Sequence, residues 1–106
     1  RLADLSPDAL AALGVAAVVG REFQLKVLER TSELGVAGLL DVLDEASEAG
    51  VIAEDPALPR RYAFVHELVR ETLYEDLAPA TRLELHARIG AVLQDAYRSD
   101  LDPHLS

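Results

Sequence analysis

The hydrophobic positions follow a helical spacing along most of the chain. From Leu10 to Val19 nearly every position is apolar, which is typical of a helix that is buried on all sides. The preceding Ser6-Pro7-Asp8 is a typical helix start, because serine can cap a free amide and proline suits the first helical position. Gly20 can end this helix in a left-handed conformation. We therefore predict a central buried helix near the start of the chain.

Two further helices are predicted before the pattern changes. The second covers about residues 24–32, and the third runs over about residues 36–49 and ends at Gly50. The apolar residues of the third helix recur at helical spacing, and we expect the following to face inward: Val36, Leu39, Leu40, Leu43 and Ala46.

A β-hairpin is predicted next, because two short strand-like runs flank a loop that contains two prolines. The runs are residues 51–54 and 62–64. A fourth helix over about 66–77 and a fifth over about 79–97 follow, the fifth opened by Pro79. Their expected inward residues are Val65, Leu68, Val69, Thr72, Leu73 and Leu77 in the fourth, and Leu85, Ile89, Val92, Leu93 and Ala96 in the fifth.

Three helices followed by a hairpin is the order of a winged helix. The fold class expected is therefore mainly α: a winged helix made of three helices and a two-stranded β-hairpin wing, followed by two additional helices. We assign residues 1–97 to this domain. Residues 98–106 are polar and contain a proline, so we expect a linker or the start of a following helical-repeat module.

The composition indicates the class of protein and its expected location in the cell. The 106 residues are 50% hydrophobic and 27% charged, as in one ordinary globular domain. Cysteine is absent, which excludes thiol chemistry and fits a reducing, cytoplasmic location. Methionine is also absent, so we expect the chain to be a piece of a longer protein. The longest apolar run is too short to span a membrane, and we expect no membrane partner.

The charge distribution disfavours direct DNA binding. The net charge is −9, and the third helix, which would enter the major groove in a helix-turn-helix protein, contains no basic residue. Its acids fall at i, i+3, i+4 and i+7 and are expected to form one acidic stripe. The stripe consists of Asp41, Asp44, Glu45 and Glu48. An alternative function is therefore a winged-helix domain that uses this acidic helix to bind another protein, and DNA binding ranks below it.

Catalytic and metal-binding patterns are missing from the sequence. The three histidines, His66, His86 and His104, lie at spacings that no short metal motif uses, and no phosphate-binding loop or nucleophile elbow occurs. We expect no catalytic residue, no metal ligand and no cofactor in this chain by itself. Tyr74 and His86 are interpreted as structural residues.

Three stretches carry a resemblance to a known family: AAVVGREFQLKVLER, GLLDVLDEASEAGVIAED and RYAFVHELVRETLYEDLAPATRLELHARIGAVL. They resemble the winged-helix region of bacterial signal-transducing ATPases of the STAND class, in which an AAA-like core is joined to LuxR-type DNA-binding domains, cyclases or kinases. Val65-His66-Glu67-Leu68 is also similar to the Met-His-Asp-Leu signature of NB-ARC ATPases, with valine in place of methionine and glutamate in place of aspartate.

The resemblance implies a regulatory role for His66. In such ATPases the winged helix folds onto the nucleotide-binding core of the same polypeptide, and the signature histidine reaches the phosphates of bound ADP. It implies that ADP or ATP with Mg²⁺ binds in the parent protein, and that a helical-repeat module follows. Arg70, one turn beyond His66, is a second candidate for the phosphates. Alternatively, His66 caps the junction between hairpin and helix through a backbone contact, and Arg70 only pairs with Glu67 or Glu71.

Overall fold

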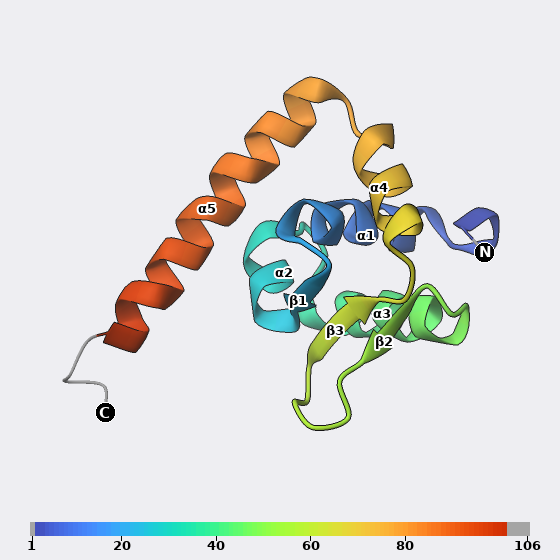
Figure 1. The fold of residues 1–106 in the computed structure, drawn as a ribbon, viewed down its shortest axis with the longest axis horizontal. Helices are drawn as coiled ribbons and strands as arrows, with labels where there is room; N and C mark the ends of the chain where they lie inside the picture. The colour runs from blue at the N-terminus through green and yellow to red at the C-terminus, as the bar shows by residue number, and fades with distance from the viewer. Residues whose placement is uncertain (1, 102–106) are drawn as a thin grey trace.

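Helix α1 (Pro7–Val19) lies at the centre of the fold, with the other helices and the sheet placed around it (Figure 1). The computed structural model describes residues 2–101, and a short 3-10 helix, η1 (Leu2–Asp4), precedes α1. The Ser6 hydroxyl accepts a hydrogen bond from the Ala9 amide at 3.1 Å and caps the helix. Seven of the 13 residues of α1 are buried, so the predicted central buried helix is confirmed.

Helices α2 (Leu25–Thr31) and α3 (Val36–Glu48) pack beside α1. In α3 the buried residues are Leu39, Val42, Leu43 and Ala46. The prediction that Val36 faces inward is wrong, because this residue begins the helix at the edge of the core and half of it is exposed. Val42 is buried instead, since it lies on the same helical face as Leu39 and Leu43.

The sheet contains one strand more than the predicted wing. Strands β2 (Ile52–Glu54) and β3 (Arg61–Phe64) form the expected hairpin, and β1 (Glu22–Gln24) pairs antiparallel with β3 to give the order β1-β3-β2. The predicted two-stranded hairpin is therefore present, and the third strand, β1, was not predicted. Phe23 of β1 lies opposite Tyr62 of β3, and their rings stack with centroids 5.8 Å apart. This aromatic pair joins β1 to the core.

Helix α4 (Glu67–Asp76) buries only Leu73. Val69 and Tyr74 are half-buried against the core, whereas Val65, Leu68 and Thr72 are exposed, Leu68 by 76%. The prediction that these three residues face inward is therefore wrong. The helix lies beside α1 (Figure 1), and its apolar side chains that pack against the core are Val69, Leu73 and Tyr74.

Helix α5 (Pro79–Leu101) extends along the side of the domain past α2 and continues beyond the predicted end at residue 97 (Figure 1). Leu85 and Ile89 pack with Val18 of α1 in a second, smaller apolar cluster. Arg88 donates to the Thr31 carbonyl at 3.0 Å at the C-terminus of α2. The mainly helical architecture is confirmed. The predicted linker falls partly on residues 102–106, which lie outside the described residues.

Candidate functional site

His66 lies at the junction between β3 and α4. The residue before it, Val65, donates its amide to the Val51 carbonyl at 3.0 Å and so extends the pairing of the hairpin. His66 itself is the N-cap residue of α4, with extended backbone angles of φ −127° and ψ 128°. Its carbonyl accepts from the amides of Val69 and Arg70, which are 3.2 and 3.4 Å away. The backbone position of His66 is therefore fixed by a strand on one side and a helix on the other.

The imidazole of His66 is exposed and makes no capping hydrogen bond. Serine, threonine, asparagine and aspartate are the residues that usually cap a helix through the side chain. In this chain the carbonyl of His66 starts α4, while its ring remains accessible to a ligand. The alternative in which His66 caps this junction through a backbone contact agrees with the bonds of its carbonyl, and the imidazole takes no part in the cap.

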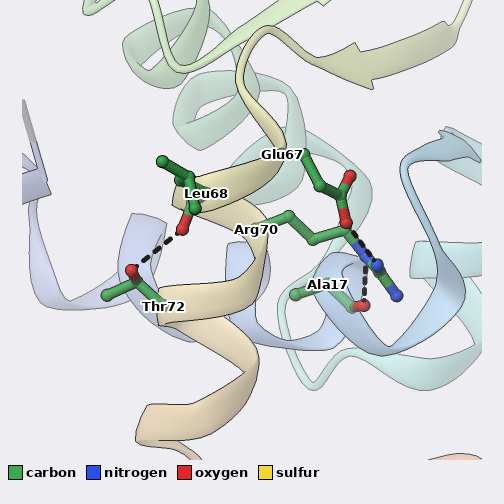
Figure 2. Close-up of polar contacts among 5 residues, drawn as sticks. All are labelled: Ala17, Glu67, Leu68, Arg70 and Thr72. Atoms are coloured by element: carbon green, nitrogen blue, oxygen red, sulfur yellow. Dashed lines mark hydrogen bonds and ion pairs between the residues drawn. The ribbon is translucent and has the colours of Figure 1, made fainter.

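Arg70 points toward α1 (Figure 2). Its Nε donates to the Ala17 carbonyl at 3.0 Å, and its Nη1 donates to the Glu67 carboxylate at 2.8 Å. Both contacts involve a half-buried guanidinium. Figure 2 places Leu68 on the opposite side of α4, where only its carbonyl is used, as the acceptor for the Thr72 hydroxyl at 2.9 Å. The side chain of Arg70 is therefore held by α1 and by Glu67, the partner that the pairing alternative gave it, and within residues 2–101 it makes no hydrogen bond to the His66 imidazole.

Tyr74 and His86 connect α4 to α5. The Tyr74 hydroxyl lies 2.8 Å from His86 Nε2, and the Arg82 guanidinium carbon lies 5.2 Å from the centre of the Tyr74 ring. A cation above an aromatic face is a favourable arrangement. The structural interpretation of Tyr74 and His86 agrees with these contacts. His104 lies outside the described residues.

Glu45 has a role that the sequence did not predict. Its carboxylate accepts from the Ser6 amide at 2.6 Å and from the Ser6 hydroxyl at 2.8 Å. In a capping box the residue three positions after the cap supplies this acceptor, but that residue is Ala9. Because Ala9 cannot accept a hydrogen bond through its side chain, the sequence indicated only that an acid elsewhere in the chain could complete the cap. Glu45 is therefore engaged in the cap of α1, and the exposed residues of the predicted acidic stripe are Asp41, Asp44 and Glu48.

One side chain in the sheet has a shifted acidity. Burial raises the pKa of Tyr62, and a hydrogen bond with Arg60 opposes this shift.

Within residues 2–101 no group of three or more histidines and carboxylates is arranged to hold a metal ion. Over the same range no helix is both long and apolar enough to cross a membrane.

Comparison of the chain with models of protein families, with curated proteins and with solved structures found no match. Any function assigned to this chain therefore depends on its own residues and their geometry.

Proposed function

We propose that the chain is a non-catalytic, regulatory winged-helix module of a nucleotide-dependent signalling ATPase. The order of elements supports the fold assignment: α1, β1, α2, α3 and then the β2–β3 hairpin, with β1 completing the sheet. A winged helix has this order, with the hairpin as its wing. Helices α4 and α5 are additions: α4 leads away from the wing, and α5 turns back past α2 (Figure 1).

The observation that carries the functional proposal is the free imidazole of His66. It stands at the first turn of α4, where helix amides and the helix dipole favour an anion. The pairing of Val65 with Val51 and the contact of Arg70 with Ala17 fix the two elements on either side. An imidazole on such a rigid junction can donate to a phosphate oxygen without reorganising the backbone.

The partner in this proposal is the nucleotide-binding core of the same polypeptide. That core supplies the phosphate loop and holds ADP or ATP with Mg²⁺, while His66 adds one contact from the winged-helix side. Exchange of ADP for ATP then shifts the balance between a closed and an open arrangement. Arg70 stabilises α4 in this arrangement through α1, and its contact with a phosphate is not part of the proposal.

The test is His66→Ala in the intact parent protein. Loss of one charge-assisted hydrogen bond lowers the closed-to-open ratio about tenfold, so ADP release accelerates and basal output rises. The matched control is His86→Gln, which changes the other described histidine at the junction of α4 and α5. Unchanged ADP release in a His66→Ala protein of normal thermal stability would contradict the proposal.

A second candidate function is protein binding through α3. Asp41, Asp44 and Glu48 project from one exposed face of this helix, and no basic residue occurs on it. A basic partner surface would complement these charges, and nucleic acid would be repelled. A charge-reversing substitution of Asp44 distinguishes the two functions. If α3 binds a basic partner, this substitution abolishes that binding and leaves ADP release unchanged.

A further inference from the structure

The outer edge of β1 has free hydrogen-bonding groups. The Phe64 amide donates to the Arg21 carbonyl and the Leu25 amide donates to the Arg60 carbonyl, both at 2.9 Å. In an antiparallel pair, residues that bond to one neighbouring strand alternate with residues whose amides and carbonyls point away from it. Arg21, Phe23 and Leu25 thus bond to β3, while the amide and carbonyl of Glu22 and the amide of Gln24 point outward. The carbonyl of Gln24, the N-cap residue of α2, accepts the first bond of that helix. The sheet order leaves β1 at the edge, with no described strand on that side.

There is room for an additional segment beside this edge. One cavity of about 530 Å³ lies between β1, α2 and the distal part of α5, and includes Leu93, which is 43% exposed. A second cavity, of about 460 Å³, lies between α2 and the tip of the hairpin and includes Leu58, which is 51% exposed. The two cavities share Gln24, Lys26 and Arg61, and we refer to them together as the hollow beside β1.

The charge of this hollow differs from that of the whole chain. Lys26 and Arg60 are exposed and have no ion-pair partner within residues 2–101, and the Arg61 guanidinium is 3.9 Å from the Glu22 carboxylate. The acids beside the hollow are Glu22 and Glu29. Three lining bases, Lys26, Arg60 and Arg61, against two lining acids give a local excess of positive charge on a chain of net charge −9. A carboxylate-bearing segment is therefore favoured over a basic one.

We propose that the edge of β1 binds an extended, acidic peptide segment of a partner protein as an additional strand. The outward amide and carbonyl of Glu22 and the amide of Gln24 supply main-chain hydrogen bonds. Alternate side chains of the segment then enter the hollow against Leu93 and Leu58, while its carboxylates lie near Lys26 and Arg61. Because β1 is only three residues long, the binding is weak and reversible.

The first experiment is a titration of the ¹⁵N-labelled chain with an acetylated, amidated EVEVE peptide, followed by NMR. The expected result is a set of saturable shifts centred on the amides of Glu22 and Gln24. The lysine counterpart KVKVK is expected to bind at least about threefold more weakly, because Lys26 and Arg61 repel it. The expected difference is small, since each surface charge pair contributes little. An EVEVE peptide that is N-methylated at every residue is expected to lose binding at least about tenfold, since it cannot donate to the edge.

The matched variants are Leu93→Glu, in the hollow, and Leu83→Glu, on the exposed side of the same helix. We expect Leu93→Glu to weaken EVEVE binding at least about threefold and Leu83→Glu to leave it unchanged. Equal binding of the N-methylated peptide, or equal effects of the two variants, would overturn the proposal. Dimerisation of the chain through β1, with no response to the peptide, would also overturn it by identifying a second copy as the occupant.

Discussion

Helices α1 and α4 differ both in their apolar pattern and in their surroundings: α1 is apolar at nearly every position, whereas half of the residues of α4 are charged. Seven of the 13 residues of α1 are buried, against one of the ten residues of α4. Helix α1 has neighbours on all sides, whereas α4 contacts the core along one face (Figure 1). A helix that is apolar nearly all round is therefore covered on all sides, whereas a helix with many charged residues is covered along one face only.

The two helices are also held by different interactions. Helix α1 is fixed by side chains that fill the core, among them Leu13, which is 1% exposed. Helix α4 relies on Leu73, on half-buried Val69 and on the polar contact between Arg70 and the Ala17 carbonyl. Substitutions should therefore affect global stability in α1 and mainly local stability in α4.

The largest expected difference is between Leu13→Ala and Leu68→Ala. The first creates a cavity in the core and should lower the free energy of unfolding by about 2–5 kcal/mol. The second removes an exposed side chain and should change that free energy by less than about 0.5 kcal/mol. Urea denaturation measures both. Similar losses for the two variants would mean that α4 is covered as completely as α1.

A smaller effect is expected from Glu45→Ala, which removes the acceptor for the Ser6 amide and hydroxyl at the start of α1. The free energy of unfolding should fall by about 1–2 kcal/mol, because two capping groups lose their partner. Glu48→Ala, one turn along α3 and exposed, is the matched control and should cost less than about 0.5 kcal/mol. If the two variants were equally stable, the cap would contribute nothing.

The smallest effect on global stability is expected from Arg70→Ala. Loss of the hydrogen bond to the Ala17 carbonyl should cost about 1 kcal/mol and should accelerate hydrogen exchange in α4 more than in α1. Glu67→Ala removes only the ion pair and should cost less than about 0.5 kcal/mol. Uniform acceleration of exchange in both helices would show that α4 does not open independently.

The element boundaries were largely predictable from local signals. Ser6, Pro7 and Gly20 mark the ends of α1, and Pro79 marks the start of α5. Strand β1 was missed because it has only three residues and its partner lies about 40 positions away in β3. No alternating pattern can be recognised in so short a segment.

The inward face of α4 and the role of Arg70 could not be predicted for another reason. Leu68 and Thr72 have the same helical spacing as Val69 and Leu73, so the sequence fits two faces equally well. The partner of Arg70 is the carbonyl of Ala17, 53 positions earlier, and a backbone carbonyl has no sequence signature. The prediction that His66 stands at the strand-to-helix junction is confirmed, whereas its contact with a nucleotide stays a prediction.

The bond between Ser6 and Glu45 also affects the order in which the chain can fold during synthesis. The two residues are 39 positions apart. At about 5–20 residues per second, a ribosome makes Glu45 roughly 2–8 s after Ser6. Until Glu45 leaves the exit tunnel, the amide of Ser6 lacks its native acceptor. Helix α1 therefore reaches its final capped form only after α3 has been made.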